Sequence, residues 1–435
     1  FRDASNITQD IDTFTIRDVS YARYMFWRAH DITQDISSFT IRNIYEAHNI
    51  FRRAYNISQN IGTFQISNVT QAYQMFFQAH DISQNIGTLD ISGVVDLSGM
   101  FAGVYNVTQD ISSFTIHYVS GADNMFWDTS NITQDIGTFT IRDVTNLYEM
   151  FLEAHDISQN IGTLDISGVV DLSGMFAGVY NLTQDISSFT IQDVSILDNM
   201  FRDASNITQD IDTFTIRDVS YARYMFEDVS GLTQDISSFT IRDVSNAMRM
   251  FQSASNSNFT ISNANLENID IMTDMFDCGV NCSFTLDNWT LNNVPFNTIF
   301  KDANNFNGTL SNWKFDSTDL SELFSGCTSF NDNLLNWDVS SVTDMSGMFQ
   351  NASSFNGDIT GWNVSNVTNM TAMFKNASSF NQDLSGWNVS NVIDISGMFT
   401  GATALLNQYS DLSFAVNNGY FENNYDTSWV EWFSP

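Results

Sequence analysis

The side chains best suited to chemistry are carboxylates that recur at one position of a repeating pattern. Asp185, Asp210 and Asp235 each follow a glutamine and lie 25 residues apart. Calcium accepts several oxygen ligands, so carboxylates stacked by a repeating fold could bind it. Stacked carboxylates also repel one another, and solvated turn acids explain the pattern more simply. Calcium is the only cofactor that the sequence leaves open.

Asparagines at a second repeated position form possible glycosylation sites. The triplet N-x-[ST], the acceptor for N-linked glycans in secreted proteins, recurs there at Asn6, Asn106, Asn131, Asn181 and Asn206. Glycans on this column would lie along one edge of a repeat array. An asparagine-rich and serine-rich chain also produces such triplets by chance. Asp31 occupies the same column, which favours a turn hydrogen bond as the column's main role.

Three cysteines give little further information. Cys278 and Cys282 are close enough in sequence for a local disulfide in an oxidising compartment, which leaves Cys327 unpaired. A zinc site needs more ligands than this pair supplies.

Residues typical of catalysis are not arranged as a catalytic site. His30, His80 and His155 share one column of the repeat but fall in non-adjacent copies. The chain has no glycine-rich phosphate loop, nucleophile elbow or H-E-x-x-H motif. We therefore expect no enzymatic activity.

Threonines flanking a central phenylalanine offer a binding surface of another kind. Thr13 and Thr15 would project from one strand face while Phe14 points inward. Outward rows of Thr and Asp could bind carbohydrate or ice, although the strand preference of threonine accounts for most of the pattern.

These positions all belong to a repeat of about 25 residues that runs through the chain. One phenylalanine marks the period at Phe1, Phe26, Phe51, Phe76, Phe101, Phe126, Phe151, Phe176, Phe201, Phe226, Phe251, Phe276, Phe300, Phe324, Phe349, Phe374 and Phe399. Some copies are identical, such as 1–26 and 201–226. This identity points to recent duplication.

Apolar positions within the repeat predict its core. Ile11, Phe14, Ile16 and Val19 stand for columns that are apolar in each of the first ten copies. Their spacing, I-x-x-F-x-I-x-x-V, is typical of a short strand and matches that of leucine-rich repeats. One copy cannot bury these side chains alone, whereas stacked copies build a continuous core. We expect a repeat solenoid, leucine-rich-repeat-like or a parallel β-solenoid, with about sixteen coils and a tight helical or 3₁₀ return near Met25.

The regularity of the repeat divides the chain into four segments. Residues 1–250 are ten regular coils, 251–323 are degenerate coils, and 324–398 are regular coils of a tryptophan type. Residues 399–435 leave the repeat and are rich in aromatic side chains, which is typical of a cap over the last coil.

The tryptophan-type coils carry a family resemblance. The sequences W-D-V-S-S-V-T-D-M-S-G-M-F (Trp337–Phe349) and F-N-Q-D-L-S-G-W-N-V-S-N-V (Phe380–Val392) resemble the BspA-type leucine-rich-repeat surface proteins. The resemblance implies a secreted or cell-surface solenoid concerned with adhesion, and it brings no catalytic residues. The first 250 residues depart from the family pattern by replacing Trp with Phe or Leu.

The net charge of the chain limits the kinds of molecule that it can bind. The formal net charge is −34, from 50 acidic and 16 basic side chains. Nucleic acid and anionic membrane surfaces are therefore unfavourable partners. No apolar run is long enough to span a bilayer.

The expected function is that of an extracellular structural or adhesive protein, with cell-surface or matrix ligands as partners. The first coil matches an internal one, whereas an aromatic segment follows the last. This difference predicts that copies of the chain associate end to end into a filament.

The acidic column yields a direct test. If Asp185, Asp210 and Asp235 bind calcium, removing the ion should lower the melting temperature, because a ligand held by the folded state alone stabilises that state. Thermal unfolding with and without a chelator measures the effect. An unchanged melting temperature would identify the column as solvated turn acids.

Overall fold

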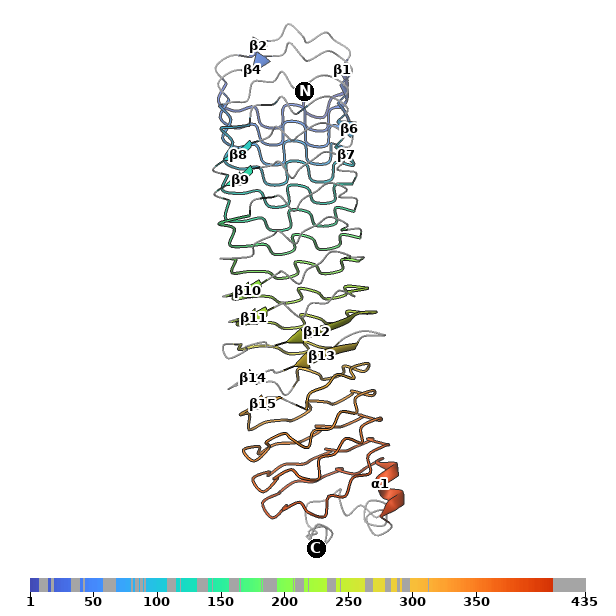
Figure 1. The fold of residues 1–435 in the computed structure, drawn as a ribbon. Helices are drawn as coiled ribbons and strands as arrows, with labels where there is room; N and C mark the ends of the chain where they lie inside the picture. The colour runs from blue at the N-terminus through green and yellow to red at the C-terminus, as the bar shows by residue number, and fades with distance from the viewer. Residues whose placement is uncertain are drawn as a thin grey trace. The chain divides into compact units, whose positions relative to one another are not determined.

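Figure 1 shows the fold of the computed structural model as a ribbon. Backbone hydrogen bonds join successive repeats. The chain divides into two units, Phe1–Thr215 and Ile216–Pro435. The structure describes residues 1–7, 15–16, 19–32, 40–41, 44–57, 68–79, 81–82, 86, 89, 91–107, 115–117, 119–130, 140–142, 144–155, 164, 166–180, 182, 194–205, 207, 215–217, 219–232, 240–242, 244–262, 269–277, 283–287, 290–291, 298–311 and 313–409.

Short parallel strands in the first unit pair with a register of one repeat. A five-stranded sheet has the order β1-β3-β5-β6-β7, formed by β1 (Ser5–Ile7), β3 (His30–Ile32), β5 (Asn56–Ile57), β6 (Asp81–Ile82) and β7 (Asn106–Val107). Ser5 pairs with His30, and Asp81 pairs with Asn106. Two further pairs join β2 (Thr15–Ile16) to β4 (Thr40–Ile41) and β8 (Thr115–His117) to β9 (Thr140–Arg142).

A turn segment follows these strands in each repeat and is bonded both internally and to the next copy. The N–H of Phe26 donates to the carbonyl of Ile50 at 2.9 Å, and the N–H of Ala29 donates within its own repeat to Phe26 at 3.0 Å. Tyr24 and Arg28 adopt left-handed backbone angles, with φ of 58° and 54°. A right-handed helix cannot contain left-handed residues four positions apart, and its backbone bonds would stay within the segment. The helical or 3₁₀ return expected near Met25 is therefore wrong.

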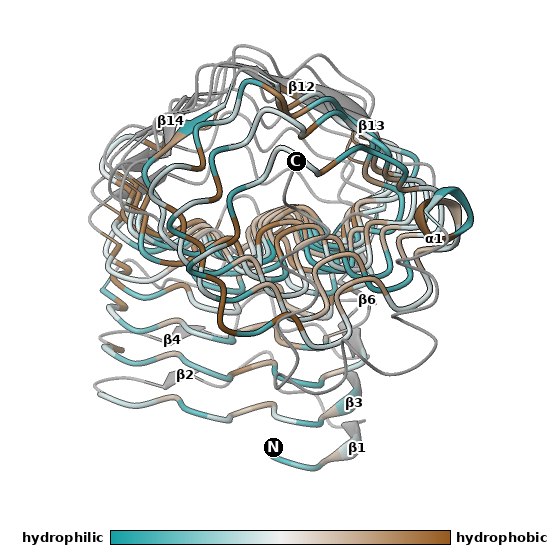
Figure 2. Cartoon of the chain, turned by 90° about the horizontal axis from the view of Figure 1, so that it is seen from below, coloured by the Kyte–Doolittle hydropathy of each residue, from teal (hydrophilic) through white to brown (hydrophobic). Residues whose placement is uncertain are grey.

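Phenylalanine stacking fills the centre of each unit. Phe151 is fully buried, and its ring centroid lies 5.5 Å from that of Phe126 and 5.7 Å from that of Phe176, with nearly parallel planes. Figure 2 shows hydrophobic residues recurring at the same places in neighbouring repeats. Identical rings at one position therefore stack with parallel planes along the array.

The other apolar columns are described in fewer copies. Ile86, Leu89 and Ile91 belong to the columns of Ile11, Phe14 and Ile16, and they are buried. The inward orientation predicted for these columns is confirmed at these three residues. The side chains of Ile11, Phe14 and Ile16 themselves lie outside the described residues.

The second unit begins with the same register and then shifts it by one residue. Its strands are β10 (Thr215–Arg217), which starts at the boundary between the units, β11 (Thr240–Arg242), β12 (Asn258–Ser262), β13 (Ser283–Asp287), β14 (Thr290–Leu291) and β15 (Lys314–Phe315). Asn258 of β12 pairs with Ser283, whereas Thr290 of β14 pairs with Lys314. This shortening matches the change in phenylalanine spacing after Phe276.

Tryptophans provide a second stacked column in the tryptophan-type coils. The rings of Trp337 and Trp362 are 6.4 Å apart, and those of Trp362 and Trp387 are 6.3 Å apart. The indole N–H of Trp362 donates at 2.9 Å to the backbone carbonyl of Leu334. Each buried ring thus satisfies its only polar atom on the preceding coil.

The helix α1 (Thr403–Gln408) follows these coils, and its Leu405 is buried. Residues 410–435, which hold most of the expected aromatic cap, lie outside the described residues. The division into four segments and the leucine-rich-repeat-like class both stay predictions. The repeat-to-repeat register favours stacked coils.

Phe151 gives a test of the stacked core. Replacing it with alanine should lower the free energy of unfolding by about 3–5 kcal/mol, because the change removes a buried ring and leaves a cavity between two others. Val170 is 40% exposed, and Val170→Ala is the control, with a change expected within about 0.5 kcal/mol. Urea unfolding measures both variants. Equal midpoints would contradict the packing described for Phe151.

Candidate ligand-binding face

The residues first predicted to carry a site lie mostly outside the described part of the chain. This holds for the calcium candidates Asp185, Asp210 and Asp235, for the disulfide candidates Cys278 and Cys282, and for Asn131, Asn181 and Asn206. Asn6 lies in β1 and Asn106 in β7, and the pairing of Asp81 with Asn106 puts this column in register along the sheet. These assignments stay predictions.

Cys327, the remaining cysteine, is fully buried. Its Sγ donates at 2.9 Å to the backbone carbonyl of Phe300, and burial raises the pKa of its thiol well above the ordinary value. A buried neutral thiol is a poor nucleophile and a poor metal ligand. Among the described residues, no group of three or more His, Cys, Asp or Glu side chains is arranged to hold a metal ion.

The turn segment alternates buried constant residues with more exposed variable ones. Ala22 and Phe26 are buried, and their columns stay apolar in the first ten repeats. The residues between them change from copy to copy. We define the variable face of the first unit as the side chains at Tyr21, Arg23, Tyr24, Trp27 and Arg28 and at the corresponding described positions of later repeats, through residue 203. Comparing the repeats column by column could have found this face from the sequence.

Positive charge collects at the first coils of this face. We call Arg2, Arg23, Arg28, Arg52 and Arg53 the arginine cluster. These five residues belong to a chain with only 16 basic side chains and a formal charge of −34. Further along the face the corresponding positions include several acidic residues: Asp96, Asp123, Asp128, Glu149, Glu153 and Asp171.

Aromatic rings support the arginines. The guanidinium carbon of Arg2 lies 4.0 Å from the ring centre of Trp27, and that of Arg28 lies 5.0 Å from the same ring. Arg52 lies 4.4 Å from the ring centre of Phe77. Stacking on an aromatic face holds a guanidinium in place while leaving N–H donors at its edge.

A polar pocket lies beside the cluster. Its volume is ≈ 380 Å³, and it is lined by Arg23, Tyr24, Glu46, His48, Gln71 and Tyr73. The Arg23 guanidinium pairs with the Glu46 carboxylate, so the two formal charges offset each other. The turn segments of three successive repeats supply these side chains.

His48 is the most constrained side chain of the pocket. It is 5% exposed, stacks on Tyr73 with a centroid distance of 4.4 Å, and meets the edge of Tyr24 at 5.8 Å. Its buried Nδ1 has no hydrogen-bond partner, and Glu46 Oε2 lies 3.7 Å from it. Burial, reinforced by Arg23, lowers the pKa of His48, so the imidazole is neutral at pH 7.

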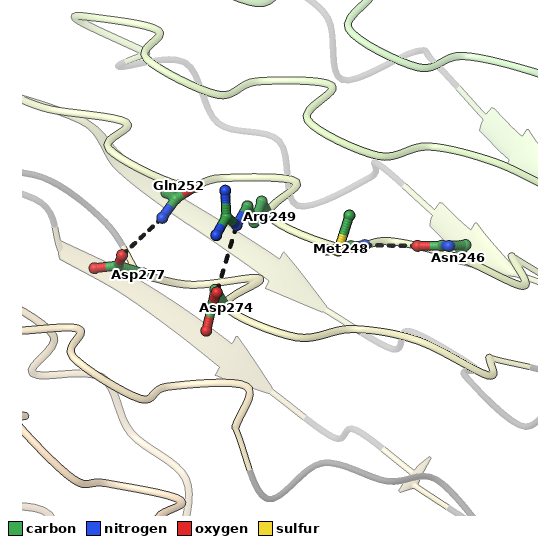
Figure 3. Close-up of polar contacts among 6 residues, drawn as sticks. All are labelled: Asn246, Met248, Arg249, Gln252, Asp274 and Asp277. Carbon is green, nitrogen blue, oxygen red and sulfur yellow. Dashed lines mark hydrogen bonds and ion pairs between the residues drawn. The ribbon is translucent and has the colours of Figure 1, made fainter.

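The second unit has polar contacts at corresponding columns. Figure 3 shows Arg249 against Asp274 at 3.4 Å and Gln252 donating to Asp277 at 3.0 Å. Burial raises the pKa of Asp277. Here arginine and glutamine side chains bind acidic partners in the next repeat. In the first coils Arg52 and Arg53 contact an aromatic ring and a neutral amide, whereas Arg2 and Arg28 share the carboxylate of Asp3.

The repeat places the chain in a known family. A family model described as Mycoplasma protein of unknown function, DUF285, matches residues 1–64, 47–163, 145–263, 248–318 and 316–414. The chain belongs to this family. Searches of curated proteins and of solved structures found no match. DUF285 membership supports a tandem-repeat protein, and the closer resemblance to BspA-type leucine-rich repeats stays a prediction.

Within the described residues, no helix combines the length and apolar character needed to cross a bilayer.

His48 makes stability depend on pH in a predictable direction. Its folded pKa is lowered from 6.5, so below about pH 6.5 the unfolded chain binds more protons and stability falls as the pH drops. Arg23, Glu46, Asp96, Tyr24 and Tyr73 face this imidazole. We expect His48→Met to reduce the shift in urea midpoint between pH 7.5 and pH 5.0.

Methionine suits this test because Met248 occupies the same column after an identical coil. The parent chain and the variant must be compared at both pH values, since the many carboxylates titrate in both. An equal loss of stability would show that His48 contributes nothing to the pH dependence.

Proposed function

We propose that this chain is a non-enzymatic, extracellular repeat protein of the cell surface, in which stacked coils form the scaffold and the variable face binds ligands. The contrast between constant buried residues and variable exposed residues carries the proposal. Ala22 and Phe26 keep their apolar type from copy to copy, while the exposed or half-buried column of Arg28 changes to Gln78 and Asp128. Packing constrains the first kind of position and leaves the second free to recognise partners.

A structural and adhesive role fits this arrangement better than catalysis. Catalytic groups need mutual geometry in which a base lies within hydrogen-bond reach of the proton that it removes. The polar groups of the pocket instead form an internal ion pair beside a neutral, stacked imidazole. Such groups are suited to hold a ligand.

Carbohydrate binding is the second function that a specific observation favours. The outward Thr and Asp rows do not carry it, because their side chains lie largely outside the described residues. The polar pocket at His48 supports it, and ice binding gains no comparable support. End-to-end association stays a prediction, since the aromatic residues of 410–435 lie outside the described residues.

Accessibility on intact cells tests the proposed location. A protease that cannot cross the membrane should digest the chain on intact source cells, while a cytosolic marker protein stays whole. Immunoblotting of both proteins, before and after lysis, gives the measurement. Protection of the chain until lysis would contradict a surface location.

A further inference from the structure

We propose that the first three coils of the variable face bind an acidic polysaccharide, with the arginine cluster on its anionic groups and the His48 pocket on a sugar ring. This inference rests on the proposed function and names its ligand class.

The arginine cluster supplies charge where the rest of the chain repels anions. Its five guanidinium groups are accompanied on the described turn segments by the carboxylates of Asp3 and Glu46. An anion approaching a chain of charge −34 is therefore attracted locally at this patch.

Contacts within the protein fix the arginine side chains of the cluster but use only some of their N–H donors. Arg52 Nη1 donates to Asn49 Oδ1 at 3.0 Å, and Arg53 Nε donates to Gln78 Oε1 at 2.8 Å. A guanidinium has five N–H donors, and these neutral amide partners do not offset the charges of Arg52 and Arg53. Arg2 and Arg28 share one carboxylate, that of Asp3, at 3.5 and 3.9 Å, so the pair keeps an excess positive charge. Burial and the nearby Arg53 lower the pKa of Arg52, which means that its charged form is disfavoured. A bound anion would stabilise that charged form.

The aromatic rings argue against nucleic acid as the partner. Base stacking requires free ring faces. Arg2 and Arg28 both lie over Trp27, and Arg52 lies over Phe77. The rings thus position guanidinium groups and are not free platforms for bases.

The pocket adds groups that suit sugar hydroxyls. Glu46 accepts hydrogen bonds, Arg23 donates them, and Gln71 does both, so the lining matches hydroxyl groups, which also donate and accept. Because Arg23 and Glu46 are paired, the pocket favours neither a free anion nor a free cation. Its ≈ 380 Å³ volume lies near the lower end for small-ligand sites, as expected for one ring.

The polar groups of the pocket leave one hydrogen-bonding atom of His48 without a partner. Its buried Nδ1 lacks a partner, and Glu46 Oε2 stays 3.7 Å away. A ligand hydroxyl bound to Glu46 can complete the network as the Arg23–Glu46 pair adjusts, both members being partly exposed. Tyr24 connects the two regions, since its ring meets His48 at 5.8 Å and Trp27 at 5.6 Å.

The chain contains a natural comparison for these residues. Residues 1–26 and 201–226 are identical, but the positions that follow differ. Asp228, Gln252 and Ser253 replace Arg28, Arg52 and Arg53, while Asn246 and Met248 replace Glu46 and His48. These replacements already occur on the same repeat and should be compatible with folding.

Binding of the full chain to three immobilised polymers tests the proposal. Dextran sulfate supplies sugar and negative charge, dextran supplies the same sugar backbone without charge, and polyglutamate supplies charge without sugar. We expect the strongest binding to dextran sulfate. Equal or stronger binding to polyglutamate would overturn the saccharide assignment in favour of an acidic protein.

Two variants separate the two parts of the surface. Arg28→Asp/Arg52→Gln/Arg53→Ser should weaken dextran sulfate binding at least about tenfold, because it removes charge-assisted hydrogen bonds. It should also flatten the salt dependence of binding. His48→Met, which keeps the Arg23–Glu46 pair and the net charge, should weaken dextran sulfate binding while leaving any polyglutamate binding unchanged.

A charge-matched control excludes a general electrostatic effect. Arg223→Asp/Arg242→Gln/Arg249→Ser changes the net charge by the same amount at coils outside the variable face and should bind like the parent. If the first triple variant binds as its control does, the arginine cluster is not the site. If the pocket variant binds dextran sulfate like the parent, the pocket takes no sugar.

Failure here is distinguishable from failure of the proposed function. Surface accessibility to protease does not depend on the ligand. A chain digested on intact cells that binds none of the three polymers overturns the polysaccharide inference alone.

Discussion

The hydrogen bonding and stacking of each repeat on its neighbour is the interaction on which the rest of the structure depends. The Phe26 N–H bonds to Ile50, and the Phe26 ring stacks on that of Phe51 at 5.3 Å. One repeat alone leaves its ring and its backbone groups facing water. Stability must therefore accumulate from contacts between neighbours, as in other repeat proteins.

This constraint separates two kinds of residue within the same turn. Column 26 must supply a flat apolar ring in every copy, because a smaller side chain would leave a gap between stacked rings. The column of Arg28 is exposed or half-buried at Arg28, Gln78 and Asp128, and it can change without disturbing that stack. Duplication followed by substitution at exposed columns can thus produce a new surface on an old scaffold, as Trp27 and Arg28 becoming Glu227 and Asp228 illustrates.

The repeat and much of its core could be predicted from the sequence, because identical columns at a fixed period require equivalent environments. The inward placement of the Leu89 and Ile91 columns followed from alternation alone. The path of the turn could not be predicted in this way, since Tyr24 and Arg28 are not residues that ordinarily favour left-handed angles. Bonds between repeats determine that path.

The candidate site was harder to predict because its side chains differ from repeat to repeat, whereas the sites predicted from the sequence lie in columns that repeat Asp or Asn. The pocket needs Arg23, Glu46 and Tyr73 from three different copies. Only their variability marks them in the sequence, and only the repeat-to-repeat register shows that they meet.

Deleting whole repeats tests the central claim about register most directly. Residues 79–106 are identical to 154–181, so removing 79–153 takes out three periods and leaves a junction that is locally unchanged. Removing 79–141 takes out two and a half periods and puts unlike residues in neighbouring positions. Urea unfolding should show a cooperative transition for the first deletion and its loss for the second. Equal cooperativity in both would contradict the dependence of the fold on stacking in register.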